Sequence, residues 1–112
     1  MTAIPRSRPV EFEARDLMIS RGYYAFRNPG ACCSVNLVGI MNQDILLVQV
    51  RRSRNILPGI REVNALYRED MDALRRLGSP RCCRKEVWIY SGQEGFRFYE
   101  VFPGGLQELG EP

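Results

Sequence analysis

The segment that most constrains the fold is an apolar run in the middle of the chain, Asp44–Arg51. Its aliphatic residues are nearly continuous: Ile45, Leu46, Leu47, Val48 and Val50. A strand with one wet face alternates apolar and polar residues, whereas a strand buried on both faces is apolar throughout. The sequence therefore predicts a central strand buried on both faces, within a domain of the α/β class.

Helical and strand patterns on either side give the order of the elements. A helix is predicted to begin near Ser7–Pro9, because apolar residues recur at helical spacing from there to Gly22. A second helical pattern covers residues 61–77. Strands are expected at 23–27, 35–41, 44–51, 86–90 and 96–102. The order is α-β-β-β-α-β-β, in which the long connection allows the third and fourth strands to be parallel neighbours.

The ends of the chain show no targeting or membrane signal. The first nine residues lack the apolar stretch of a secretory signal, and no apolar run approaches the ~20 residues that cross a bilayer. We expect a flexible tail at 1–8, a single domain at 9–103 and a second flexible tail at 104–112. The expected location is the cytoplasm, with no membrane partner.

The charged residues exclude some chemistry and favour a nucleic-acid partner. The chain has no His, which excludes His-based acid–base catalysis, Ser–His or Cys–His pairs and His-containing zinc sites. Of its sixteen cationic residues only Lys85 is not Arg. Guanidinium groups grip phosphate bidentately, although a G+C-rich genome also produces an Arg excess. Thirteen acidic residues limit any binding surface to a local patch.

The distances along the sequence between several polar residues match the pattern of a known family. Glu11 lies eleven residues before Gly22, and Arg27 follows in the next short strand. Asn36 lies near the start of the second strand, thirteen residues before Gln49 in the third. These spacings, with Arg51 two residues later, resemble those of the restriction-endonuclease-like PD-(D/E)XK nucleases. They are most similar to the small archaeal and viral proteins of the Holliday-junction-resolvase type. The resemblance implies an αβββαβ core whose mixed sheet is flanked by helices.

The resemblance also implies a metal site, in which two positions depart from the pattern. The family has a metal-binding Asp where this chain has Asn36, and a catalytic Lys where it has Arg51. Its metal ligands map to Glu11, Asn36 and Gln49, and its catalytic residues to these three with Arg51. Mg²⁺ or Mn²⁺ is the implied cofactor if the protein is active, and none otherwise. Because Mg²⁺ prefers carboxylate oxygens, neutral amides at two positions imply weak metal binding.

Two further acids, Glu62 and Asp44, lie near the expected site in the sequence, where the missing Asp leaves room for a replacement. Some members of the family recruit an acid from the helix after the third strand, where Glu62 lies. Asp44 begins the third strand, roughly 16 Å from Gln49 at the rise of an extended chain, which is too far to share a metal. Alternatively, Asn36 and Gln49 are only polar residues paired across a hairpin.

Arginines near the expected site are candidates for phosphate contact. They are Arg27, Arg51, Arg52, Arg54 and Arg61. A solvated loop is the alternative for those that follow the third strand. Tyr23, Tyr24 and Phe26 suit stacking on unpaired bases, but core packing is the simpler role for at least two of them.

Two adjacent cysteine pairs, Cys32–Cys33 and Cys82–Cys83, each precede a strand. Adjacent cysteines lack the spacing of a zinc knuckle, so small buried residues are the default interpretation. A disulfide between the pairs and a four-cysteine zinc site are the alternatives.

Three functions remain open at this point. The first is a DNA-binding protein of nuclease fold, with a degenerate metal site, that cleaves weakly or not at all. The second is an active Mg²⁺-dependent endonuclease or Holliday junction resolvase. The third is a non-catalytic protein-interaction subunit. The resemblance implies structured or duplex DNA as the partner, and a homodimer.

Overall fold

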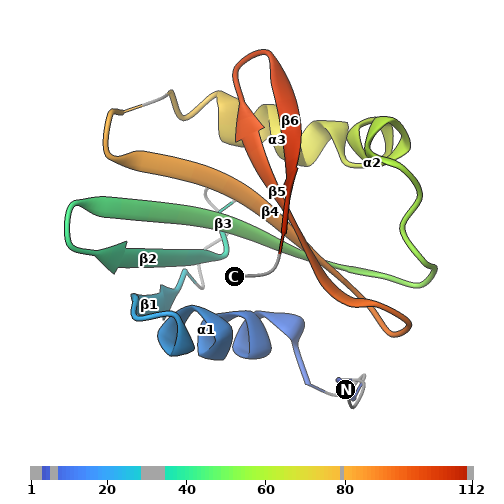
Figure 1. The fold of residues 1–112 in the computed structure, drawn as a ribbon, viewed down its shortest axis with the longest axis horizontal. Helices are drawn as coiled ribbons and strands as arrows, with labels where there is room; N and C mark the ends of the chain where they lie inside the picture. Colours follow the sequence, from blue (N-terminus) through green and yellow to red (C-terminus); the bar gives the residue numbers. More distant parts are fainter. Residues whose placement is uncertain (1–3, 6–7, 29–34, 79, 111–112) are drawn as a thin grey trace.

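A computed structural model describes residues 4–5, 8–28, 35–78 and 80–110 of the chain. The helices are α1 (Val10–Ser20), α2 (Ile60–Leu66) and α3 (Arg68–Arg75). The strands are β1 (Tyr24–Arg27), β2 (Leu37–Met41), β3 (Asp44–Ser53), β4 (Cys83–Ser91), β5 (Gly95–Phe102) and β6 (Gly105–Leu109). They form one twisted sheet, with α1 on one side and α2 and α3 on the other (Figure 1). The expected α/β class with a mixed sheet flanked by helices is confirmed.

The centre of the sheet is the parallel pair of β3 and β4. The two strands run in register from Ile45 opposite Cys83 to Ser53 opposite Ser91, which confirms the expected parallel neighbours. All other neighbouring strands are antiparallel. A parallel connection must cross the sheet, and here α2 and α3 make that crossing.

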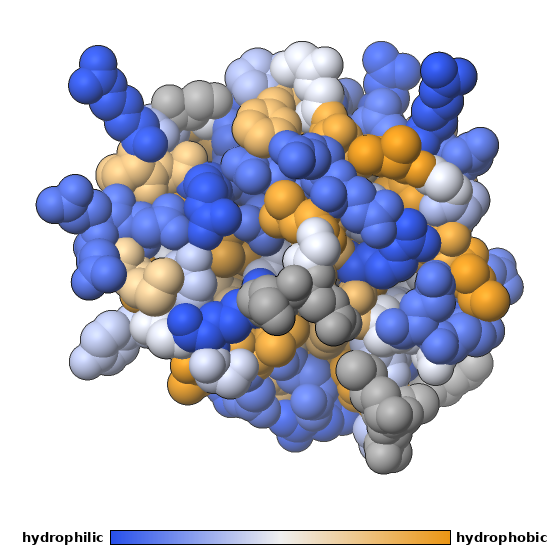
Figure 2. Space-filling model, in the orientation of Figure 1, coloured by the Kyte–Doolittle hydropathy of each residue, from blue (hydrophilic) through white to orange (hydrophobic). Residues whose placement is uncertain are grey.

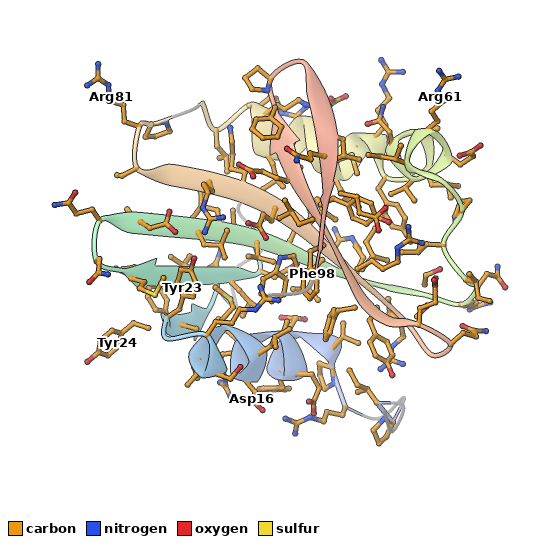
Figure 3. All side chains as sticks on the ribbon, viewed as in Figure 1. Asp16, Tyr23, Tyr24, Arg61, Arg81 and Phe98 are labelled. Carbon is orange, nitrogen blue, oxygen red and sulfur yellow. The ribbon has the colours of Figure 1, made fainter. Side chains whose placement is uncertain are left out.

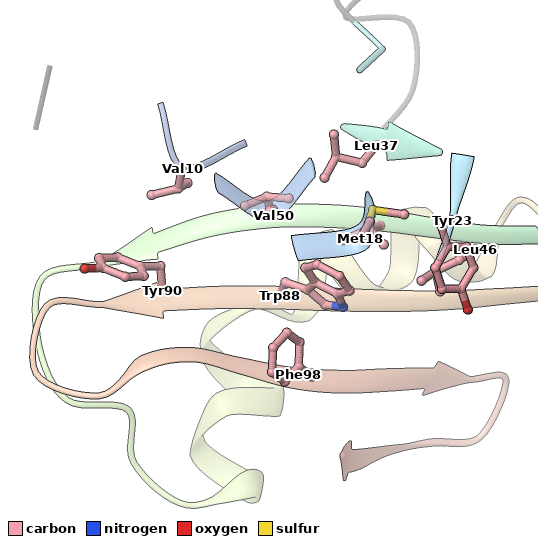
Figure 4. Packing of buried hydrophobic residues seen from close by; sticks show 11 residues of the cluster. Val10, Met18, Tyr23, Leu37, Leu46, Val50, Trp88, Tyr90 and Phe98 are labelled. Carbon is pink, nitrogen blue, oxygen red and sulfur yellow. The ribbon is translucent and has the colours of Figure 1, made fainter. Parts of the chain in front are cut away.

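Alternate residues of β3 enter two separate hydrophobic cores. Leu46, Val48 and Val50 pack with α1 in the first core, which also contains Trp88 and Phe98 (Figure 4). Leu47 packs from the opposite face against the second core, beneath α2 and α3. The nearly continuous apolar run thus reflects burial on both faces, as expected.

Helix α1 lies close to the sheet because of one glycine. Val10, Ala14 and Met18 are buried at intervals of four residues and form the helix face that meets the sheet. Gly39 of β2 lies directly beneath this face. A Cβ atom at Gly39 would collide with Cε of Met18 and touch the Tyr23 ring. A larger residue at Gly39 would therefore require the Met18 side chain to move.

Some elements differ from their expected bounds. β3 continues through Arg52 to Ser53, and β4 begins at Cys83 rather than Glu86, because each is hydrogen-bonded to the other along its whole length. The single helix expected at 61–77 is two helices, divided at Tyr67, whose φ of −111° and ψ of 25° are not helical. The apolar repeat predicts which face of a helix is buried. It continues through Tyr67 and therefore does not reveal that this residue is non-helical.

Both expected tails contain residues that contact the sheet. Gly105–Leu109, which lie within the segment expected to be a flexible tail, pair with β5 as strand β6. Leu106 and Leu109 are half-buried against the two cores, and this burial stabilises the strand. At the other end, the backbone N–H of Ile4 donates to the Tyr90 hydroxyl at 2.7 Å.

A polar cluster joins the start of β3 and β4 to the segment after α1. Arg84 donates to Asp44 at 2.7 Å, to the Tyr23 hydroxyl at 2.6 Å and to Glu86 at 3.2 Å. Trp88 Nε1 donates to the other oxygen of Glu86 at 2.8 Å. Glu86 is only 2% exposed. Burial raises the pKa of its carboxyl above the usual 4.5, although the bond from Trp88 and the charge of Arg84 oppose the rise.

The raised pKa predicts an unusual pH dependence of stability. The folded protein holds the Glu86 proton more tightly than the unfolded chain does. The free energy of unfolding must therefore fall as the pH rises from about 4.5 through the raised pKa. With no His in the chain, few other groups titrate just above that range. We expect urea unfolding between pH 4.5 and 7 to show this fall, and Glu86→Gln to flatten it. The exposed Glu69→Gln serves as the control, and an unchanged slope in Glu86→Gln would contradict the assignment.

Candidate functional site

The two site residues expected on β3 point toward α3. Gln49 is paired in register with Val87 and Arg51 with Ile89, and both partners belong to the second core. Gln49 is 1% exposed, so its amide needs hydrogen-bonding partners inside the protein. The Arg51 side chain is 38% exposed and extends toward solvent at the same face.

The partner of both side chains is Asp70 of α3. Its carboxylate accepts two bonds from Arg51, from Nε at 3.1 Å and from Nη2 at 3.0 Å. It also accepts a bond from Gln49 Nε2 at 2.8 Å. A bidentate guanidinium–carboxylate pair is among the stronger polar contacts in proteins. We call Gln49, Arg51 and Asp70 the Asp70 cluster.

The Asp70 cluster leaves one buried oxygen without a partner. A carboxylate only accepts hydrogen bonds, so the amide nitrogen of Gln49 must face Asp70. Its Oε1 atom then points away and has no hydrogen-bond partner among the described residues. Burying a carbonyl oxygen without a hydrogen bond lowers the stability of the fold. Oε1 is also the oxygen in the Asp70 cluster that is free to act as a ligand for a cation.

Asn36 lies just before β2 and binds the backbone of β3 on both sides of Gln49. Its N–H donates to the Val48 carbonyl at 2.9 Å, and its Oδ1 accepts from the Val50 N–H at 2.7 Å. The side-chain oxygen that would face a metal in the family pattern therefore carries a structural hydrogen bond. An Asp at this position would keep that bond and leave a second oxygen available.

Glu11 has a different environment from the Asp70 cluster. It lies in the first turn of α1, with its carboxylate 3.7 Å from Nε of Arg27 at the end of β1. The Arg27 guanidinium stacks over the Phe12 ring at 4.2 Å. The structure thus places Glu11 with α1 and the Asp70 cluster with α3, on opposite faces of the sheet.

These residues are a poor match for Mg²⁺ or Mn²⁺ as they stand. A hard cation takes anionic oxygen ligands, and the carboxylate nearest to Gln49 is already neutralised by Arg51. The described residues contain no group of three or more acidic or cysteine side chains arranged to hold a metal ion. The guanidinium of Arg51 supplies the positive charge that lies beside the Asp70 carboxylate.

The other expected arginines differ in how far they are engaged. Arg52 donates to backbone carbonyls of the N-terminal segment, at 3.3–3.4 Å from Ile4, Pro5 and Arg8. Arg54 and Arg61 are exposed, and no ion pair involves either of them within the described ranges. Arg61 projects from α2 into solvent (Figure 3). These two are the guanidinium groups most available to a phosphate.

Asp70 is the residue that the sequence pattern missed, since the helix there reads as a solvated face of mixed charge. A signal was present: Val63, Tyr67, Asp70 and Leu74 follow one helical stripe. Glu62, weighed as a replacement acid, is instead exposed in the first turn of α2. Asp44 contacts Tyr23 and Arg84, away from Gln49, as the strand length implied.

The cysteine alternatives are left open. Cys32 and Cys33 lie outside the described residues. Cys82 is exposed and Cys83 half-buried, and both are free thiols. None of the helices in the described ranges is long and apolar enough to span a bilayer.

The geometry predicts that Asp70 stabilises the fold. Asp70→Ala leaves the buried Gln49 amide and Arg51 without their acceptor, so we expect a loss of about 2 kcal/mol in the free energy of unfolding. Asp72→Ala on the same helix removes a more exposed pair with Arg75 and should cost less than about 1 kcal/mol. Equal losses in urea unfolding would show that the cluster is not a special contact.

Comparison with known proteins supports the fold and goes no further. No family model matches the chain. No curated protein matches it either. Among solved structures, the chain is similar to Hjc, a Holliday junction resolvase from the archaeal hyperthermophile Archaeoglobus fulgidus. The alignment covers 90% of this chain and 80% of the resolvase, with a TM-score of 0.56 and 18% sequence identity. The chain therefore has a fold like that of an archaeal Holliday junction resolvase.

Proposed function

We propose that this protein binds DNA and that its nuclease-type metal site is degenerate, so that it cleaves DNA weakly or not at all. The observation that carries the proposal is the Asp70 cluster. The chain has Gln49 and Arg51 where the nuclease pattern has a metal ligand and a Lys, and both are bonded to Asp70. The guanidinium of Arg51 takes the place of the divalent metal ion that polarises the phosphate and activates water in phosphodiester hydrolysis.

Asn36 and Glu11 add to this interpretation. The oxygen of Asn36 is held by the Val50 N–H, and the carboxylate of Glu11 lies beside the Arg27 guanidinium. Arg51 cannot serve as a general base, because a guanidinium group stays protonated in proteins. In this proposal Glu11, Asn36, Gln49 and Arg51 are the remnants of a catalytic site.

Exposed guanidinium groups support the DNA-binding half of the proposal. Polar and charged side chains cover most of the face in Figure 2. Arg54 and Arg61 are the favoured phosphate contacts. Arg27, Arg51 and Arg52 already contact groups of the protein itself and are weaker candidates. The proposed partner is duplex or structured DNA, bound by a homodimer in the cytoplasm.

One observation favours an active metal-dependent endonuclease as the second candidate. Gln49 Oε1 is a buried oxygen without a partner beside the carboxylate of Asp70. If Arg51 were displaced when DNA binds, Asp70 and Gln49 together would offer oxygen ligands to Mg²⁺. Asp70 would then replace the acid missing at position 36.

A cleavage assay separates the two candidates. Plasmid, branched and single-stranded DNA are incubated with Mg²⁺ or Mn²⁺. We expect no cleavage by the unmodified protein and measurable cleavage by the double variant Asn36→Asp with Arg51→Lys, because an anionic ligand is restored and the guanidinium removed. Asn36→Asp alone leaves Arg51 paired with Asp70 and should stay inactive. Cleavage by the unmodified protein that is lost in Asp70→Asn, with the variant still folded by circular dichroism, would instead establish the endonuclease.

DNA binding is tested by its salt dependence. Each phosphate contact adds roughly one to the slope of log affinity against log salt. Arg54→Gln with Arg61→Gln should therefore lower the slope by about two and weaken binding to duplex or branched DNA, as measured by fluorescence anisotropy. Arg81→Gln is the matched control, because Arg81 projects from the opposite end of the molecule (Figure 3). The absence of salt-sensitive binding in the unmodified protein would favour the protein-interaction subunit.

A further inference from the structure

A pocket lies on the α1 side of the sheet, between the end of that helix and the last strand. Helix α1 packs against β1, β2 and β3, whereas β5 and β6 lie farther along the same sheet (Figure 1). The hollow between them has a volume of about 590 Å³. Sites for small organic molecules typically measure roughly 300–1,000 Å³. We call this hollow the α1–β6 pocket.

Apolar side chains form much of the wall of the α1–β6 pocket. They come from segments far apart in the sequence: Leu17, Tyr23, Met41, Leu46, Phe98 and Leu109. Leu46 and Phe98 are buried in the first core, on the strands to either side of Trp88 (Figure 4). The pocket therefore reaches the hydrophobic core and suits the apolar body of a small molecule.

Two guanidinium groups and one carboxylate line the same pocket, from Arg21, Arg84 and Glu86. Arg21 follows α1, and its guanidinium lies over the ring of Trp88 at 5.3 Å and the ring of Phe98 at 4.6 Å. The side chain of Arg84 is 40% exposed, whereas Glu86 is buried. The positive groups are therefore more accessible to a bound molecule than the negative one.

The hydrogen bonds of the cluster favour an anionic ligand over a cationic one. One oxygen of Glu86 accepts from Trp88 Nε1 at 2.8 Å, and the other accepts from Arg84 Nη1 at 3.2 Å. Both oxygens of Asp44 accept from Arg84, at 3.3 Å and 2.7 Å. Nη1 of Arg84 has two N–H groups and makes one bond among the described residues, so it can donate another. A cation would compete with Arg84 for the carboxylates, whereas an anion can accept the remaining N–H.

We propose that the α1–β6 pocket binds a small organic carboxylate, whose head accepts a hydrogen bond from Arg84 beside the charge of Arg21. Its apolar body rests against Leu46 and Phe98. The two guanidinium groups are balanced by two nearby carboxylates, so the pocket favours a head with one negative charge over a phosphate with two. The inference does not depend on the proposed DNA binding and is tested without DNA.

Glu86 makes this binding depend on pH. The charged groups that face it are Arg84 on its own strand, Arg21 after α1, and Glu100, which lies opposite it on β5. Burial raises the pKa of Glu86, and the charge of Glu100 adds to the rise. As the pH falls through that raised pKa, Glu86 loses the charge that repels a bound carboxylate and competes for Arg84. The ligand should therefore bind more tightly at lower pH.

Three compounds with one carbon skeleton test the head group: 3-phenylpropionate, the neutral 3-phenylpropanol and the cationic 3-phenylpropylamine. Trp88 is the single tryptophan of the chain and lies under Arg21, so its fluorescence reports that the pocket is occupied. Isothermal titration calorimetry gives the affinities. We expect the acid to bind in the millimolar range or tighter. The alcohol and the amine should bind about tenfold more weakly, because neither offers an anion to a guanidinium.

Substitutions in the full chain locate the site. Arg21→Gln should weaken binding of the acid several-fold and leave binding of the alcohol unchanged. Arg15→Gln is the matched control, because Arg15 lies on α1 over the Phe12 ring and does not line the pocket. Glu86→Gln should bind the acid with constant affinity between about pH 5.5 and 8, where a free carboxylate probe stays ionised. The unmodified protein should show the rise in affinity toward low pH.

Contrary outcomes are distinct from one another. Circular dichroism first verifies that each variant is folded. Failure of the unmodified protein to bind the acid overturns the inference. Equal affinity for the acid and the alcohol, or tighter binding of the amine, refutes the carboxylate as the ligand head. Full affinity in Arg21→Gln, or an equal loss in Arg15→Gln, shows that the acid binds elsewhere. Persistence of the pH dependence in Glu86→Gln contradicts the competition for Arg84.

Discussion

The parallel pairing of β3 with β4 is the constraint on which the rest of the structure depends. Both strands are buried on both faces, so each face needs a covering layer. A parallel connection must also cross the sheet, and α2 and α3 provide one layer as part of that crossing. Helix α1 provides the other, at the close distance that Gly39 allows. The antiparallel strands then extend the sheet outward on both sides.

Polar residues on so buried a strand require partners from another element. Gln49 and Arg51 alternate with Val48 and Val50, so they face the α3 side, where Asp70 accepts bonds from both. The same contact carries the functional argument. A carboxylate whose charge is balanced by a guanidinium is a weak ligand for a hard cation, and in the Asp70 cluster the charges are balanced internally.

The two edge strands of the sheet, β1 and β6, differ in the side chains that they expose. β6 carries exposed polar residues and an ion pair, which discourage pairing with another strand. β1 carries Tyr24 and Phe26, which favour it.

The sequence alone predicted the α/β class and the order of the elements along the chain as far as β5, and it allowed the parallel pairing of β3 with β4, because burial on two faces and helical repeats are local patterns along the chain. It located Gln49, Arg51 and Asn36 by spacing. It could not identify Asp70 as their partner, since that contact joins residues about twenty positions apart and depends on how α3 lies across the sheet. The break at Tyr67 and the pairing of β6 were likewise decided by tertiary packing. Sequence spacing assigns residues to a strand, whereas their hydrogen-bond and ion-pair partners depend on which element packs against that strand.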